Sequence, residues 1–218
     1  MKTFLTFAML VCTAAVAFAQ NDDKPYFTKT FSPSSFKALN VRTSGGSIQV
    51  TGESGEARVE MYVRSNNWNG KSSMSKEEID ERLQDYEVRV ALDGETLVCK
   101  AKRKSENDSW DWKKSLSISF KVFVPEKTTT DLATSGGSIK LARLSGVQNF
   151  TTSGGSLHLN ELRGNIKGRT SGGSIHLTNC REQLDLSTSG GSIHADACDG
   201  DIRLVTSGGS IQLDEVTG

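Results

Sequence analysis

The sequence has no excess of charge of either sign. Its 26 lysines and arginines are balanced by 26 aspartates and glutamates, so the formal net charge at pH 7 is zero. A protein that attracts nucleic acid or an anionic membrane through its overall field needs an excess of basic residues. The balance therefore leaves no overall field to steer such partners, and we expect no nucleic-acid partner.

Apolar residues and prolines are also scarce. Hydrophobic residues make up 35% of the chain, aromatic residues 7%, and prolines number 3, whereas there are 21 glycines. Such a composition is typical either of disorder or of a thin, turn-rich repeat protein. It argues against a thick globular core, and the strict repeats described below favour the second interpretation.

Long apolar runs are missing after the first residues. Phe4 to Phe18 is apolar, follows a basic start, and ends in Ala17-Phe18-Ala19, a small-x-small pattern. This predicts a signal peptide over residues 1–19, cut between Ala19 and Gln20, and an exported protein of the periplasm, cell surface or extracellular space. No later stretch is long enough for a membrane-spanning helix, so we expect no transmembrane segment after cleavage.

Cysteine is sparse. Cys12 lies in the apolar run, where bulky Val11 argues against a lipoprotein site, and the mature chain keeps Cys99, Cys180 and Cys198. Cys180 and Cys198 are separated by one full period of the repeat described below, so adjacent strands would bring them within disulfide range. Because their column is apolar, the leading interpretation is that they are buried thiols that act as small hydrophobic residues. A disulfide between them, which export permits, is the alternative.

The sequence contains one phrase, Thr-Ser-Gly-Gly-Ser-Ile, six times, with a single change of Ile to Leu. The last five copies start at equal intervals, and such a fixed short period is the mark of a stacked-repeat architecture. The first copy precedes the second by one residue more than five such periods, so we do not expect the segment between them to continue the same stack. The copies start at Thr43, Thr134, Thr152, Thr170, Thr188 and Thr206.

Apolar and polar residues alternate within each repeat. Ile139 and Leu141 flank Lys140, and apolar residues recur at these two positions in every later repeat. A period of two within a strand and of 18 between repeats places the apolar side chains inside a narrow stack of parallel strands. The sequence therefore predicts an all-β fold, in which residues 127–218 form a parallel β-solenoid, expected to be right-handed, of about five 18-residue coils.

The paired glycines are expected to form corners of this stack. A phosphate-binding loop would need glycines that lead into a helix, whereas a strand pattern follows each pair here. We expect these glycines to adopt positive φ at a tight corner where a Cβ would clash, and the flanking Thr and Ser to form stacked hydroxyl ladders. The corner glycines are Gly45, Gly46, Gly136, Gly137, Gly154, Gly155, Gly172, Gly173, Gly190, Gly191, Gly208 and Gly209.

The chain before the repeats is less regular. Residues 20–35 are expected to form a leader, and residues 36–126 an N-terminal β region with an excursion over residues 65–115. Within the excursion, a capping-box sequence that begins at Ser75 predicts one short helix. The dipeptide Asp93-Gly94 between two alternating segments predicts a hairpin.

All three histidines occupy one outward position of the repeat, between two apolar columns. A row of imidazoles on adjacent strands is suited to binding a transition metal or to titrating as a coupled set. A polar exposed face copied along with the repeat is the alternative. No Asp or Glu shares the column to orient the rings, so we expect no metal and no cofactor, and the row is only a candidate. It consists of His158, His176 and His194.

No catalytic set stands out. We expect the aspartates of the repeats to be scattered over different columns: Asp185, Asp196, Asp199 and Asp214. The leading hypothesis is a non-enzymatic binding or structural module that presents a flat, repetitive face to a surface partner or glycan. The alternative is a polysaccharide-acting β-helix enzyme with its groove beside the excursion.

Two further features leave alternatives open. The last coil reaches Gly218 without a capping sequence, so we expect either a truncated chain or a second subunit that covers this coil, as in a self-associating scaffold. The excursion carries tryptophans that either stack on sugar rings or pack on its helix: Trp68, Trp110 and Trp112.

Three segments resemble the DUF4097 family, a bacterial family of adhesin-type domains built from β-strand repeats. They are Leu39-Asn-Val-Arg-Thr-Ser-Gly-Gly-Ser-Ile-Gln-Val50, Val122-Phe-Val-Pro125 and Leu132-Ala-Thr-Ser-Gly-Gly-Ser-Ile139, and the similarity extends over about residues 36–218. The resemblance implies an exported, solenoid-like bacterial adhesin. It supplies no catalytic residues.

Overall fold

The computed structural model describes residues 24–66, 74–104 and 115–218. The predicted signal peptide, with Ala19 and Gln20, lies outside these residues, and so do Trp68, Trp110 and Trp112. The described chain is mostly β-structure, which confirms the all-β class. It also contains a short 3₁₀ helix, η1 (Pro33–Ser35), and one α-helix, α1 (Lys76–Leu83). No helix in these three ranges is both long and apolar enough to cross a bilayer.

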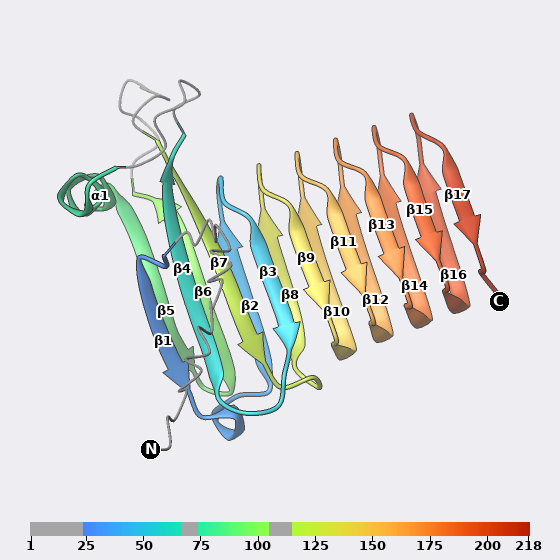
Figure 1. The fold of residues 1–218 in the computed structure, drawn as a ribbon, viewed down its shortest axis with the longest axis horizontal. Helices are drawn as coiled ribbons and strands as arrows, with labels where there is room; N and C mark the ends of the chain where they lie inside the picture. The colour runs from blue at the N-terminus through green and yellow to red at the C-terminus, as the bar shows by residue number, and fades with distance from the viewer. Residues whose placement is uncertain (1–23, 67–73, 105–114) are drawn as a thin grey trace, which may run out of the picture.

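The strands form two sheets that face each other across a narrow core (Figure 1). Sheet A has the spatial order β1 (Phe27–Phe31), β4 (Ala57–Ser65), β7 (Leu116–Val124), β3 (Ile48–Gly52), β9 (Ile139–Ala142), β11 (Leu157–Asn160), β13 (Ile175–Thr178), β15 (Ile193–Asp196) and β17 (Ile211–Asp214). Sheet B has the order β16 (Asp199–Thr206), β14 (Arg181–Thr188), β12 (Arg163–Thr170), β10 (Ser145–Thr152), β8 (Thr129–Thr134), β2 (Ala38–Thr43), β6 (Thr96–Arg103) and β5 (Tyr86–Asp93).

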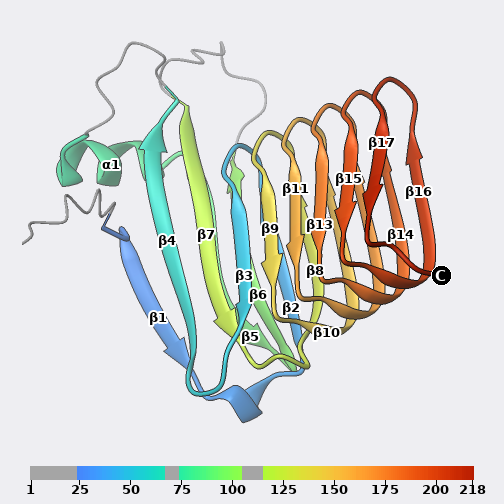
Figure 2. The ribbon, with the colours of Figure 1, turned by 45° about the vertical axis from the view of Figure 1, so that its right-hand side comes forward.

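Each repeat supplies a strand to sheet B and then, after the Gly-Gly corner, a four-residue strand to sheet A (Figure 2). Successive repeats pair in parallel at the spacing of the sequence period, so Thr152 lies opposite Thr170 and Leu157 opposite Ile175. The predicted apolar columns point inward, and Leu157 is fully buried. The parallel strands are thus confirmed, whereas the number of coils and the handedness of a solenoid stay predictions.

The first copy of the repeated phrase stacks directly on the second. β2 pairs in parallel with β8, which places Thr43 opposite Thr134, and β3 pairs with β9, which places Ile48 opposite Ile139. The segment between the two copies lacks the phrase, but it adds β6 beside β2 and β7 beside β3. Antiparallel β1, β4 and β5 then complete that end of the two sheets. β1 comes from the stretch that the sequence assigns to a leader.

The helix and the hairpin of the excursion lie where the sequence places them. The Ser75 hydroxyl accepts the backbone N–H of Glu78 at 3.2 Å, which caps the start of α1. β5 and β6 pair antiparallel with Asp93 opposite Thr96, so a two-residue turn joins them. Both elements lie at the end of the molecule opposite β17 (Figure 1).

Each corner is held by its threonine and its second glycine. The Thr170 hydroxyl donates to the carbonyl oxygen of Gly155 in the preceding repeat at 2.7 Å and accepts the N–H of Gly173 at 3.3 Å. A Cβ on Gly173 would lie 2.1 Å from the Gly155 carbonyl oxygen. The second glycine is therefore required because successive corners approach too closely for any side chain.

The first glycine of each pair is less constrained. A Cβ on Gly172 would lie 3.6 Å from the nearest carbonyl oxygen, that of Ser153, which is an ordinary contact. The expected positive φ at the corner glycines is wrong, because none of the paired glycines has one. Among the described residues, glycines with positive φ are Gly55, Gly94, Gly146, Gly164 and Gly200.

We expect Gly173→Ala to lower the free energy of unfolding by about 1–3 kcal/mol, the usual range for overpacking. The matched control is Gly172→Ala, which has room for the added methyl group and should change stability by less than about 1 kcal/mol. Urea unfolding followed by circular dichroism measures both. Equal losses in the two variants would show that close approach of the corners is not the constraint.

A candidate binding face on sheet A

The outer face of sheet A is built from two rows of side chains that cross the strands. Each four-residue strand turns two side chains outward because alternate residues point to opposite faces; in β11 they are His158 and Asn160, on either side of buried Leu159. The histidine row consists of Gln49, Lys140, His158, His176, His194 and Gln212. The second row consists of Thr51, Ala142, Asn160, Thr178, Asp196 and Asp214.

The three histidines lie side by side, as their spacing predicts. The rings of His158 and His176 are stacked, with centroids 5.2 Å apart and planes 7° from parallel. The ring of His194 is tilted by 58° from that of His176, at 6.4 Å. Its Nδ1 lies 3.7 Å from Asp214 Oδ2. A carboxylate thus reaches the histidine row from the second row, whereas the sequence pattern predicted no acidic side chain beside the rings because none shares their column.

The histidine row does not have the geometry of a metal centre. Within residues 24–66, 74–104 and 115–218, no group of three or more His, Cys, Asp or Glu side chains is placed to hold a metal ion. A transition metal needs nitrogen ligands that converge to about 2 Å from one point. The rings of His158 and His176 instead lie parallel.

The aspartates of the repeats do not all lie in different columns. Asp196 and Asp214 lie directly opposite each other in one column, so the expectation that they occupy different columns is wrong. The two are one repeat apart in the sequence and therefore necessarily share a column. Asp185 is paired with Arg203 at 3.1 Å, on the outer face of sheet B, and Asp199 lies 3.5 Å from Arg181.

The middle of the sheet A face carries cations without carboxylates. The outward residues of the five adjacent strands β7, β3, β9, β11 and β13 include Lys121, Lys140, His158 and His176, and no Asp or Glu. An open hollow of about 290 Å³ lies over β3, β9, β11 and β13, where the short side chain of Ala142 separates larger neighbours in the second row. We call Lys121, Lys140, His158 and His176 the cationic strip.

The environment of His158 disfavours its protonated form. Partial burial lowers the pKa of its imidazole below the ordinary value of 6.5, and positive charge on His176 and Lys140 lowers this pKa further. No carboxylate opposes these effects at His158.

The three described cysteines are buried, and no disulfide joins any two of them in this structure. Cys180 and Cys198 lie in adjacent repeats, where their sulfurs approach the carbonyl oxygens of Thr178 at 3.5 Å and Asp196 at 3.3 Å. The hydrogen bond with Cys198 and burial raise the pKa of the Cys180 thiol. Burial raises the pKa of Cys99 to about 12. A disulfide between Cys180 and Cys198 stays a prediction.

Comparisons with known proteins give only distant likenesses. No family model matches this chain, and no curated protein matches it. Among solved structures, a candidate cell adhesion protein from Clostridium sporogenes is 14% identical over 88% of this chain and 98% of its own, with a TM-score of 0.43. A candidate adhesin from Bacteroides fragilis is 13% identical over 86% and 96%, with a TM-score of 0.36.

A third solved structure, a candidate lipid-binding protein from Parabacteroides distasonis, is 13% identical over 90% of this chain and 97% of its own, with a TM-score of 0.30. Likenesses at this level do not support an argument about function. The resemblance to the DUF4097 family remains a resemblance, and the functional argument depends on the geometry of the chain itself.

We expect acid to destabilise the fold partly through His158. Because its pKa is lowered in the fold, the unfolded chain binds this proton more readily, so stability falls as pH drops below about 6.5, the value for an unperturbed histidine. His158→Gln should reduce the loss of thermal midpoint between about pH 7.5 and pH 5, measured by circular dichroism. The same loss in the wild type and in the variant would contradict this assignment.

Proposed function

We propose that this chain is an exported, non-enzymatic binding module of the cell envelope, which holds a glycan against the outer face of sheet A. The observation that carries the proposal is the regular pair of rows on this face. Every repeat adds the same two outward positions in parallel register. An extended polymer would therefore meet the same contacts at each step, as partners of repeat proteins do.

The two outer faces differ in how their polar groups are satisfied. On sheet B, polar groups bond to one another across strands: Arg42 donates to Asp131 at 2.5 Å, and Asn165 donates to Gln183 at 3.2 Å. On sheet A, Asn160 donates to Glu161 at 3.0 Å and Gln212 donates to Asp214 at 3.2 Å. None of the described carboxylates, however, forms an ion pair with Lys140, His158 or His176. Donors without internal partners are available to an external ligand, which favours sheet A as the binding face.

The binding face is tested by filling its hollow. Ala142→Trp places an indole in the second row of sheet A, whereas Ala133→Trp places the same side chain on the outer face of sheet B. We expect the labelled wild-type protein to bind at least one member of a glycan array, Ala142→Trp to lose more than about tenfold in affinity, and Ala133→Trp to retain it. Equal binding by both variants would show that sheet A is not the face. Binding of no glycan by the wild type would contradict the function.

Exposed core residues at the last coil favour a second function, self-association. Ile211 and Leu213 are 43% and 53% exposed, whereas Ile193 and Ala195, their equivalents one repeat earlier, are fully buried. β16 and β17 are also the edge strands of their sheets, and open edges pair readily with other strands. These features support the proposal that two copies join through this coil.

Self-association is tested by sedimentation velocity over a range of protein concentrations. We expect a concentration-dependent dimer in the wild type that Leu213→Lys abolishes. Val147→Lys is the matched control, because Val147 is 42% exposed on the outer face of sheet B, away from the last coil. A wild type that stays monomeric at all concentrations, or a dimer that both variants weaken equally, would contradict this second proposal.

A further inference from the structure

We propose that the sheet A face is selective for acidic polysaccharides, whose sugar rings carry carboxylates, and that it binds them more tightly at acid than at neutral pH. The inference depends on the proposed function and narrows its ligand to one chemical class. It follows from the cationic strip, whose basic side chains come from four strands of sheet A.

Carboxylates of the protein border the strip without entering it. At one end, Glu60 on β4 accepts hydrogen bonds from Arg58 and from the Tyr62 hydroxyl, both at 2.8 Å. At the other end, Asp196 and Asp214 lie beside His194, which we therefore leave out of the strip. Glu60 also lies directly opposite Lys121 in the register of β4 and β7. Between the two ends, the Asn160 amide donates to the Glu161 carboxylate at 3.0 Å. None of the described carboxylates forms an ion pair with Lys140, His158 or His176.

The spacing of the strip suits an extended polymer. Lys140, His158 and His176 are in direct cross-strand register, and adjacent strands lie about 4.8 Å apart. The second row adds amide and hydroxyl groups from Asn160 and Thr178 beside these cations. A chain of sugar rings laid across the strands would meet cations for its carboxylates and hydrogen-bonding groups for its hydroxyls. The hollow at Ala142 leaves room for a ring.

Protonation of the strip makes binding depend on pH. The charged and titratable groups that act on His158 are His176 and Lys140, and no described element packs over this side of sheet A. A bound carboxylate would offset the repulsion among these three groups, so the imidazoles take up protons as the ligand binds. Sugar carboxylates stay ionised at pH 5, since an ordinary carboxyl has a pKa near about 4.

Nucleic acid fits this face less well than a polysaccharide. Single strands are usually held by exposed aromatic side chains on which bases stack. The aromatic residue that β7 directs to this face is Phe123, which is 7% exposed and lies beneath the Arg58 guanidinium, 4.0 Å from its ring centroid. Among the described residues, β7 therefore offers no exposed ring for stacking beside Lys121, and the outward residues of β3 and β9 include no aromatic side chain.

The test is calorimetric titration of the purified protein with an oligogalacturonate and with a neutral cello-oligosaccharide of equal length, at about pH 5 and pH 8 and constant ionic strength. We expect the oligogalacturonate to bind at least about tenfold more tightly at the lower pH. Near pH 6, titrations in two buffers of different ionisation enthalpy should show that binding takes up one to about two protons.

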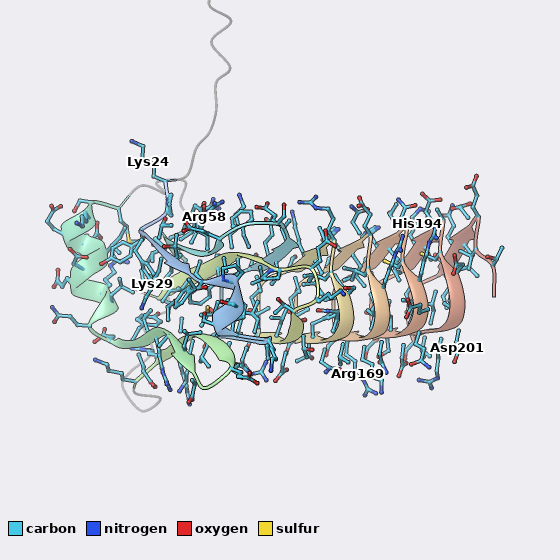
Figure 3. The ribbon with its side chains drawn as sticks, turned by 90° about the horizontal axis from the view of Figure 1, so that it is seen from below. Lys24, Lys29, Arg58, Arg169, His194 and Asp201 are labelled. Carbon is cyan, nitrogen blue, oxygen red and sulfur yellow. The ribbon has the colours of Figure 1, made fainter. Side chains whose placement is uncertain are left out.

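The variants locate the effect. We expect the double variant His158→Gln, His176→Gln to lose the pH dependence and the proton uptake, and Lys140→Gln to weaken binding at both pH values. The control is Arg169→Gln, which removes one positive charge, as Lys140→Gln does. Arg169 projects from the face opposite His194, so this change lies away from the strip (Figure 3). It should leave both measurements unchanged. Circular dichroism checks that each variant is folded.

The remaining outcomes separate this inference from the proposed function. Equal binding of the neutral and acidic oligosaccharides, lost in Ala142→Trp, would overturn the acidic selectivity and leave the proposed function standing. Binding of neither oligosaccharide would overturn this inference, whereas the proposed function would be overturned only if the wild type also bound no member of the glycan array. A third outcome is that the strip variants leave oligogalacturonate binding unchanged while Arg169→Gln weakens it. This outcome would place the site on sheet B and overturn this inference.

Discussion

The close approach of successive Gly-Gly corners is the constraint on which the rest of the molecule depends. The second glycine of each corner leaves no space for a Cβ beside the carbonyl of the repeat before it. A threonine hydroxyl from each later repeat donates to that same carbonyl, as Thr170 does to Gly155. Because these contacts allow one register, each repeat lies directly over its predecessor. Every other regularity of the structure follows from that register.

The register turns a sequence repeat into surface rows. The interior positions remain apolar, and Phe150 shows how they adapt, since its ring fills the space beside Gly168 where a side chain is missing. The outward positions are free to differ between repeats without disturbing the core. Along the sheet A face, Lys140 is followed by His158 and His176, and Asp196 lies toward the other end. The functional proposals depend on these differences, because the residues Thr-Ser-Gly-Gly-Ser of the repeated phrase form the corners and are the same in every repeat.

Several features were beyond the reach of sequence reasoning. The direct stacking of Thr43 on Thr134 joins two copies of the phrase that are far apart in the chain, and a separation that is no multiple of the repeat gives no sign of it. The contact between His194 and Asp214 crosses from one row to the next, whereas the repeat period relates only residues of the same column. The expectation of positive φ at the corner glycines was wrong. A sequence can require glycine either for a positive φ or for close approach of two backbones, and at these corners close approach is the reason.

The sequence by itself determined the β class, the buried columns, the positions of the corners and the alignment of His158 with His176 and His194. These are consequences of period, and a period is visible in one dimension. Only the tertiary structure decided which glycine of each pair is indispensable, where the excursion joins the two sheets, and which cations lie without a carboxylate. The reason is physical: close contacts between backbones and the charge around a side chain depend on distances through space. Residues far apart in the chain set those distances.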